Sequence, residues 1–241
     1  MRAALTIASC EALKIFGQVK YRVIAVLTVI GAFAAAWFRS GGAGNMANYP
    51  FTALFFTGRV VVPACLFMLA SDLIAGEVHS GEIKALLLRP VSRHCVMFGK
   101  LVAMAGYAAG IFFMVFLLST VLSLFFAGFA EISVVSVAAA YLMGFIPVLT
   151  VTAFSVMVGA LTGSGTSCFF GCMAGYLGSM AVGIVFPAIT PALFTSYMGI
   201  GRMVIGSSVP VAGLITGIVI LLAYGAAFLS AAVLRFLSRE I

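Results

Sequence analysis

The chain has 241 residues, of which 64% are hydrophobic and 8% are charged, and its mean hydropathy is +1.26. Soluble globular domains carry about 25% charged residues, so this composition excludes a soluble globular protein. The formal charge of +7 indicates membrane topology and attraction to anionic lipid. It does not indicate nucleic-acid binding, because the sequence contains no soluble module with a basic face interleaved with aromatic residues.

Six apolar runs predict an all-α integral membrane protein with one transmembrane domain over residues 1–241. A bilayer core of about 30 Å needs about 20 apolar residues per helix, so the length accommodates about six spans. The runs are continuously apolar, whereas the strands of a membrane barrel alternate. They cover residues 23–38, 51–75, 96–129, 132–161, 168–189 and 211–234.

Residues 1–20 precede the first run and mix charged with apolar residues. They predict an amphipathic helix on the inner membrane surface, with Glu11 and Lys14 facing water. The same charges argue against a removable signal peptide, which has an uninterrupted apolar stretch. The alternative is a cytoplasmic extension of the first span. The apolar side of the helix would be formed by Leu5, Ala8, Leu13, Ile15 and Phe16.

The positions of lysine and arginine predict that both termini lie in the cytoplasm. This orientation leaves only Arg39, Arg59 and Arg202, of 13 Lys and Arg residues, outside or within the membrane. Cytoplasmic loops carry the excess of basic residues in multi-pass proteins. We therefore expect a multi-pass protein of a prokaryotic-type inner or plasma membrane.

The sequence GEVHSGEIKALLLRPVSR, residues 76–93, predicts a short cytoplasmic helix between the second and third spans. Ser80 is suited to the N-cap, Glu82 lies in the first turn, where the helix dipole favours an acid, and Pro90 ends the helix. One side of this helix carries an apolar stripe. The stripe indicates either packing on the chain's own membrane domain or docking of a soluble partner. It is formed by Ile83, Leu86 and Leu87.

This segment resembles the cytoplasmic segment of ABC-2-type exporter permeases. The shared pattern is an acid after the second span, then glycine, an acid, a Leu-Leu pair, proline, a small polar residue and a basic residue, all within residues 72–100. The six predicted spans and the N-terminal helix match the layout of the same family. The resemblance implies a dimer of permease subunits, identical or related, each of which docks a separate ATP-binding subunit.

The resemblance further implies that residues 76–93 couple the ATPase to export of a lipophilic or amphipathic substrate. Asp72 and Glu77 have an alternative structural role, in which they pair with Lys100 or Arg93. The implied docking residues are Glu77, Glu82, Ile83, Leu86, Leu87, Arg89 and Arg93.

No phosphate-binding loop accompanies these features. Gly99-Lys100 is the nearest approach, but it lacks the upstream glycine and the following Ser or Thr of that motif. We therefore expect the chain to be no enzyme and to hold no cofactor by itself, with ATP and Mg bound by the partner ATPase.

Arg59 lies inside the second predicted span, where an ionisable residue is by default a functional hypothesis. It would line a conduit or meet an anionic group on the substrate. The alternative is that it reaches the outer headgroups or pairs with Glu131. Further along, prolines and glycines break up the apolar residues 186–210, which predicts short re-entrant half-helices that form an outer gate.

Other candidate chemistry is sparse. Cys168 and Cys172 fall one helical turn apart in an apolar span, where packing is favoured over a thiol or metal site. His79 and His94 have no carboxylate or cysteine cluster at ligand spacing, so no metal is expected. Gly106–Gly110, Gly171–Gly175 and Gly213–Gly217 are spaced for close helix packing within or between subunits.

Two rival classes remain open, together with a nearer alternative within the ABC class. A secondary transporter is expected to carry acids inside its spans or an internal repeat, and neither is evident here. A membrane assembly factor would need a reactive cluster. A haem-exporter-like subunit of cytochrome c maturation would also have six spans and depend on an ATPase, so topology does not separate it from the first reading.

Overall fold

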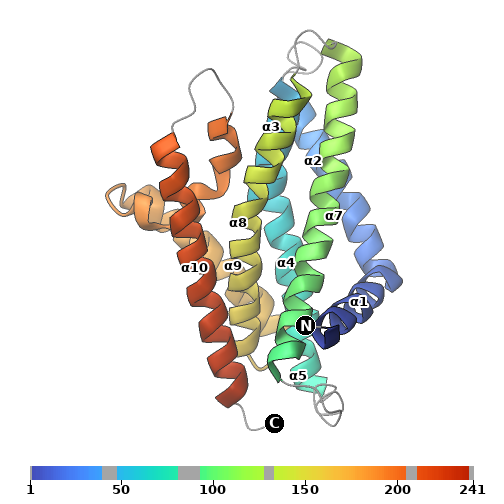
Figure 1. The fold of residues 1–241 in the computed structure, drawn as a ribbon, viewed down its shortest axis with the longest axis vertical. Coiled ribbons are helices and arrows are strands. Elements are labelled where there is room, and N and C mark those ends of the chain that lie inside the picture. The colour runs from blue at the N-terminus through green and yellow to red at the C-terminus, as the bar shows by residue number, and fades with distance from the viewer. Residues whose placement is uncertain (1, 40–47, 81–92, 128–132, 205–210, 239–241) are drawn as a thin grey trace.

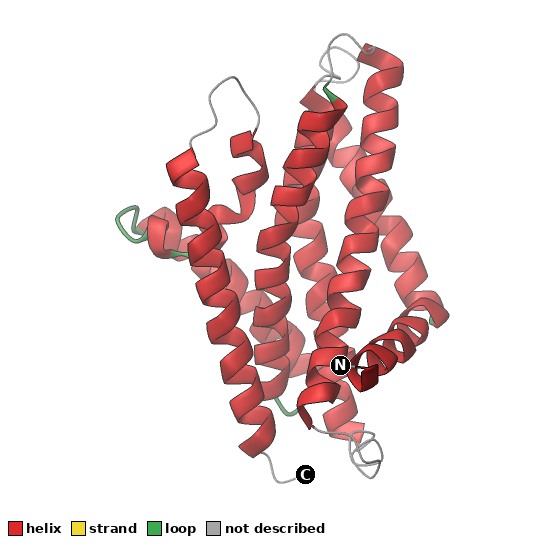
Figure 2. Cartoon of the chain, in the orientation of Figure 1, coloured by secondary structure: helices red, strands yellow, loops and turns green. Residues whose placement is uncertain are grey.

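The computed structural model describes residues 2–39, 48–80, 93–127, 133–204 and 211–238. All regular elements in these ranges are helices, and the described residues form no strand (Figure 2). The long helices run side by side along the long axis of the molecule (Figure 1). The all-α prediction is therefore confirmed.

Five helical stretches are long and apolar enough to cross a membrane: Tyr49–Ser80, His94–Phe126, Val134–Leu161, Gly165–Val185 and Val211–Phe236. They correspond to the second to sixth predicted runs. The last four lie in α7 (Arg93–Ala127), α8 (Val134–Leu161), α9 (Gly165–Val185) and α10 (Val211–Ser238). The first run forms the helix α2 (Val19–Arg39), but the count of six spans stays a prediction.

The second span is a broken helix. It consists of α3 (Tyr49–Phe56), a π-helical turn η2 (Thr57–Val61), α4 (Val62–Ala70), a second π-helical turn η3 (Ser71–Gly76) and α5 (Glu77–Ser80). Pro63 lies at the start of α4 and has no N–H, so the carbonyl of Arg59, four residues earlier, loses its usual helical donor. The missing N–H of Pro63 explains why the helix widens to a π-helical turn at η2.

The N-terminal helix α1 (Arg2–Gly17) lies across the lower end of the bundle and packs on α7, and α2 rises from its end at a different angle (Figure 1). The helix was predicted, and Lys14 is exposed as expected. Glu11 was predicted to face water as well, but it is buried at 6% exposure. Burial of Lys100 on α7 requires a nearby counter-charge, and this requirement determines which side of α1 faces inward.

After α9 the chain makes a turn that projects to the side of the bundle (Figure 1). It continues in two short 3₁₀ helices, η4 (Thr190–Ala192) and η5 (Phe194–Val204), and η5 packs on α8 and α10. Gly201 makes the close contact, because a Cβ there would overlap the carbonyl oxygen of Ala140. Residues 205–210 of the predicted outer segment lie outside the described ranges.

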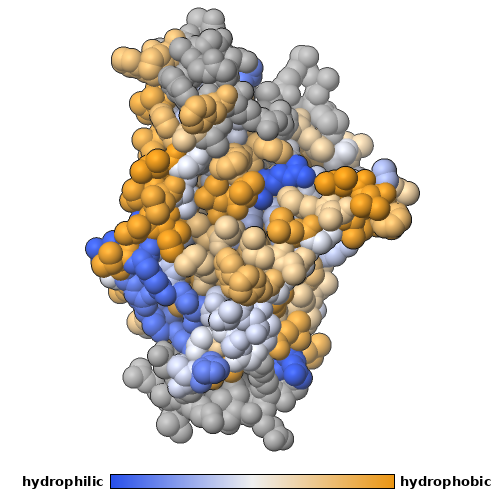
Figure 3. Space-filling model, turned by 180° about the vertical axis from the view of Figure 1, so that it is seen from behind, coloured by the Kyte–Doolittle hydropathy of each residue, from blue (hydrophilic) through white to orange (hydrophobic). Residues whose placement is uncertain are grey.

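The outer surface matches a membrane protein. Seen from behind, the coloured surface of the upper and middle parts is mainly hydrophobic apart from one hydrophilic patch near the middle, and further hydrophilic residues gather in the lower part (Figure 3). The lower part includes the junction of α1 with α2, where Lys20 and Arg22 are exposed.

Candidate functional site

Four charged side chains from three helices meet at the lower end of the bundle, and we call them the ion cluster: Glu11, Lys14, Glu77 and Lys100. Lys100 Nζ donates to Glu77 Oε2 at 2.5 Å and to Glu11 Oε1 at 3.4 Å. It also donates to the Leu73 carbonyl oxygen at 2.7 Å. Lys14 Nζ donates to Glu77 Oε1 at 2.5 Å. Two acids and two bases thus balance in charge and join α1, α5 and α7.

The ion cluster is buried except for Lys14. Lys100 is 1% exposed and Glu77 is 5% exposed, so their charges are removed from water and compensated by each other. Of the alternatives raised for Glu77, its pairing with Lys100 is confirmed. A role in docking stays a prediction for this residue, as it does for Arg93, whose side chain lies outside the described residues.

A second pair lies beside the ion cluster at the start of α2. Lys20 Nζ and the Tyr21 hydroxyl both donate to Asp72 Oδ2 at 2.6 Å. Lys20 and Asp72 are partly exposed, so this pair contributes less to stability than a buried pair. The Tyr107 hydroxyl donates to the Tyr21 carbonyl oxygen at 2.9 Å. Asp72 thus pairs with Lys20, a partner that the sequence did not suggest, and among the described side chains it forms no ion pair with Lys100.

The ion cluster lies at the two ends of the predicted docking segment, residues 76–93. Glu77 begins α5, which lies at the start of the segment, and Lys100 lies two turns into α7, which begins at the end of the segment. Both helix ends lie at the lower end of the molecule (Figure 1). The remaining predicted docking residues lie outside the described ranges, as does Glu131, so no contact is described for them. They are Glu82, Ile83, Leu86, Leu87 and Arg89.

Arg59 occupies the π-helical turn η2, ten residues after the start of the second span, or roughly 15 Å along it at 1.5 Å per residue. The Tyr176 hydroxyl of α9 donates to the Arg59 carbonyl oxygen at 2.7 Å. The Tyr176 hydroxyl thereby replaces the backbone N–H donor that Pro63 cannot supply to this carbonyl. The guanidinium lies over the ring of Phe55, with 5.3 Å from its carbon to the ring centre.

The Arg59 guanidinium forms no ion pair within the part of the chain that the structure describes. The predicted partner Glu131 lies outside that part. A charged arginine at the centre of a spanning helix costs about 2.5–3.5 kcal/mol on insertion scales. Arg59 therefore remains a candidate for contact with an anionic group.

This chain of long apolar helices with a charged lower end is similar in sequence to known proteins. A family model described as "ABC-2 family transporter protein" matches residues 8–181. The chain belongs to the ABC-2 family. A similar protein is the ABC transporter permease protein NatB of Bacillus subtilis (strain 168), 53% identical over 57 residues, which are 22% of this chain and 15% of NatB.

The family match places this chain among the membrane components of ABC transporters, as the sequence pattern of residues 72–100 predicted. The matched region includes α1 from residue 8, the ion cluster, Arg59 and most of α9. The match to NatB covers a small part of both chains, so the activity of the whole protein remains to be proposed.

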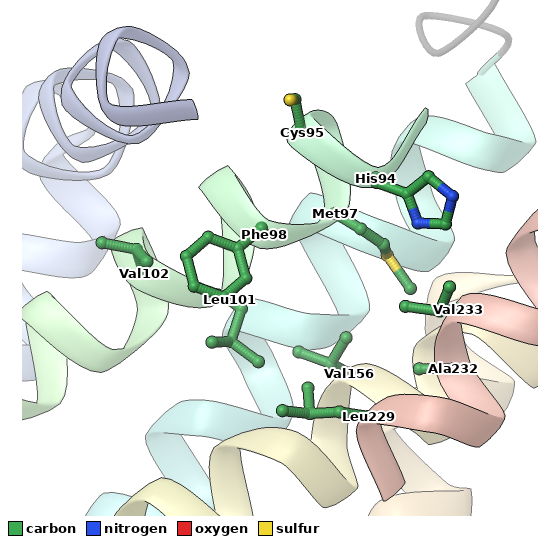
Figure 4. Close-up of a pocket in the computed structure, with 10 residues that line it drawn as sticks. All are labelled: His94, Cys95, Met97, Phe98, Leu101, Val102, Val156, Leu229, Ala232 and Val233. Carbon is green, nitrogen blue, oxygen red and sulfur yellow. The ribbon is translucent and has the colours of Figure 1, made fainter. Parts of the chain in front are cut away.

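In this ABC-2 protein an apolar groove of about 400 Å³ lies between the start of α7 and the end of α10. His94 and Met97 reach toward Val233 of α10, whereas Cys95 points away from it (Figure 4). No group of three or more His, Cys, Asp or Glu residues that could hold a metal occurs among the described residues. Cys168 and Cys172 are both fully buried, which fits the packing role expected for them.

The sequence left two functional features unidentified. The first is the pairing of Glu11 with Lys100, because no local spacing connects residues so far apart. The second is the Tyr176 contact with Arg59. Here a signal was present, since Pro63 follows Arg59 by four residues and must leave its carbonyl without the usual donor.

Proposed function

We propose that the chain is the membrane-spanning permease subunit of an ATP-driven exporter, and that a separate ATPase docks on residues 76–93. Family membership supports the permease role, as does the name of the similar protein NatB. ATP and Mg would bind to the ATPase. A second permease subunit, identical or related, would complete the membrane part.

The ion cluster is the observation that carries this proposal. Glu77 lies at the start of the docking segment and Lys100 follows the segment, and the two side chains are joined at 2.5 Å. Lys14 adds α1 to the same carboxylate. A force applied to the docking segment therefore passes to α1 and α7 together. A membrane part that is driven by a soluble motor needs such a rigid connection at the end where the motor binds.

Outward movement of a lipophilic or amphipathic substrate fits the remaining features. The described spans carry their acids, Asp72 and Glu77, at the lower end of the second span, which disfavours a carrier driven by ions bound at mid-membrane. Residues 186–210 would form the outer gate. Support for this role comes from η5, whose Ile200 is buried against neighbouring helices.

The docking proposal is tested by co-purification in a mild detergent. The tagged chain is expressed with the proteins encoded beside it, and the ATPase that co-purifies is quantified. With the double variant Leu86→Asp/Leu87→Asp, the amount of co-purified ATPase is expected to fall by more than about tenfold, because burial of each leucine contributes about 1.5–3 kcal/mol. The variant should still insert and elute as the parent does.

A matched control places the same two charges outside the apolar stripe. His79 and Ser80 are exposed at the end of α5, so His79→Asp/Ser80→Asp adds two acids in the same segment without altering a leucine of the stripe. It is expected to retain the ATPase. Equal recovery with the leucine variant would refute docking on the stripe, and absence of any ATPase with the parent would favour an ion-coupled carrier or an assembly factor.

A further inference from the structure

A cavity of about 210 Å³ lies beside Arg59, between α9 and the turn that follows it. Its polar lining consists of Arg59 with three hydroxyl side chains, and its apolar lining comes from α9. The volume is below the roughly 300–1,000 Å³ of pockets that enclose whole drug-sized ligands. The cavity therefore suits a small polar group rather than an entire lipophilic molecule. The hydroxyl residues are Thr190, Thr195 and Ser196.

The cavity carries a positive charge that no described carboxylate neutralises. The described acids that form ion pairs all lie at the lower end of the molecule. The nearest along the same helix is Asp72, thirteen residues or roughly 20 Å further on at 1.5 Å per residue. A guanidinium presents five N–H donors in a fixed fork, which matches the oxygens of a phosphate. The positive charge of the cavity thus favours binding of an anionic group such as a phosphate.

The hydroxyl groups add a second requirement. Thr190 Oγ1 donates to the Gly183 carbonyl oxygen at 2.8 Å, and Ser196 Oγ donates to the Thr190 carbonyl oxygen at 2.6 Å. Both hydroxyl hydrogens are therefore in use, and the two oxygens are left as acceptors. Acceptors beside a cation suit a ligand that combines a phosphate with hydroxyl donors.

The position of the cavity determines how a ligand reaches it. Arg59 lies roughly 15 Å along the second span from Tyr49, so a headgroup bound there is drawn inward from the level of the other headgroups. On α9, Ile184 lines the cavity and is 81% exposed, and Leu177 is 51% exposed. The cavity thus opens beside an exposed apolar helix, on which an acyl chain could lie.

We propose that this cavity binds the headgroup of an anionic phospholipid that carries headgroup hydroxyls, with Arg59 on the phosphate and Thr190 and Ser196 as acceptors for the hydroxyls. The acyl chains lie along the exposed side of α9. This site goes beyond the proposed export function and does not depend on it, because it belongs to the isolated chain and needs no ATPase.

The test uses the purified full chain in nanodiscs of phosphatidylcholine that contain phosphatidylglycerol as a minor component. Lipid retained by the protein is measured by native mass spectrometry. The parent is expected to retain phosphatidylglycerol. The amount retained by Arg59→Gln is expected to be lower by about tenfold or more, because charge-assisted bonds to phosphate are strong. Arg59→Lys should lose less, since it keeps the charge without the fork.

Two controls separate the site from general attraction and from damage to the fold. Arg235→Gln removes the same charge from the exposed last turn of α10 and should retain phosphatidylglycerol as the parent does. Ser196 is exposed, so Ser196→Ala tests the site even if Arg59→Gln fails to fold. It is expected to reduce the preference for phosphatidylglycerol over phosphatidic acid by several-fold.

A competition arm distinguishes a lipid from a soluble phosphate ester. Free glycerol 3-phosphate at the same headgroup concentration should not displace phosphatidylglycerol, because it lacks the acyl chains. Equal retention by the Arg59→Gln and Arg235→Gln variants would overturn the proposal. Displacement by free glycerol 3-phosphate would overturn it as well, since the site would then recognise a soluble anion.

Discussion

Lys100 has the most completely buried charge among the described residues, at 1% exposure. Its three acceptors come from α1, from η3 and from α5, so one side chain connects separate segments of the lower end. A charge buried to this degree is tolerated only with partners. The stability of this region therefore depends on Lys100 more than on the exposed pair of Lys20 with Asp72.

Replacement of Lys100 by methionine tests this difference. Lys100→Met leaves Glu11 and Glu77 buried beside each other without their shared cation, and breaking a buried pair in this way costs about 3–5 kcal/mol. Lys20→Met breaks a pair that is partly exposed and should cost about 0–1 kcal/mol. The measurement is the loss of folded protein on heating in detergent, followed by size-exclusion chromatography. Equal midpoints for the two variants would contradict the assignment.

The orientation of α1 shows where residue patterns stopped being informative. Helical spacing predicted the helix from residues 1–20, but it assigned Glu11 to water because charged residues usually face it. Lys100 lies 89 positions away in the chain, and its burial reversed that assignment. Local periodicity contains no term for a distant charge, so the pattern could not predict that Glu11 faces inward.

At the scale of elements, the second span was predicted as one helix over residues 51–75. The structure confirms its existence and adds two π-helical turns, one at Arg59 and one at the lower end. The first follows from Pro63. The second packs on the start of α9, where the Ser71 hydroxyl donates to the Gly165 carbonyl oxygen at 2.7 Å. Such a contact between elements is invisible in the local sequence, whereas the proline was visible.

A double-variant cycle tests how the first turn is stabilised. Tyr176→Phe removes the hydroxyl that donates to the Arg59 carbonyl and is expected to cost about 1–3 kcal/mol, the usual penalty for a buried acceptor left short. Pro63→Ala restores a backbone N–H four residues after Arg59. In that background Tyr176→Phe should cost little. Additive costs in the thermal unfolding of the four proteins would show that the two groups do not share the carbonyl.

At the scale of the whole molecule, composition and the apolar runs were sufficient for the membrane class and the all-α fold, because both follow from the thickness of a bilayer. The pattern of residues 72–100 was sufficient for the ABC-2 family. The residues of the docking stripe lie outside the described ranges, so their role stays a prediction. The orientation in the membrane also stays a prediction, and the structure makes it testable because it separates two exposed serines at opposite ends.

Ser80 ends α5 at the lower end of the molecule, and Ser133 precedes α8 at the upper end (Figure 1). Both are exposed. Each is replaced by cysteine in a background in which Cys10 and Cys95 are serine, since the other three cysteines are buried. If the basic lower end is cytoplasmic, a membrane-impermeant maleimide should label Ser133→Cys in intact cells and Ser80→Cys in inverted vesicles alone.

The two variants act as controls for each other, because each must react in one preparation and stay unreactive in the other. The reverse pattern would place the ion cluster and both termini outside. An ATPase could then not reach residues 76–93, and the proposed docking would fail together with the orientation. Labelling of both variants in intact cells would instead mean that the two ends are not separated by the membrane, which would contradict the spanning arrangement of α7 and α8.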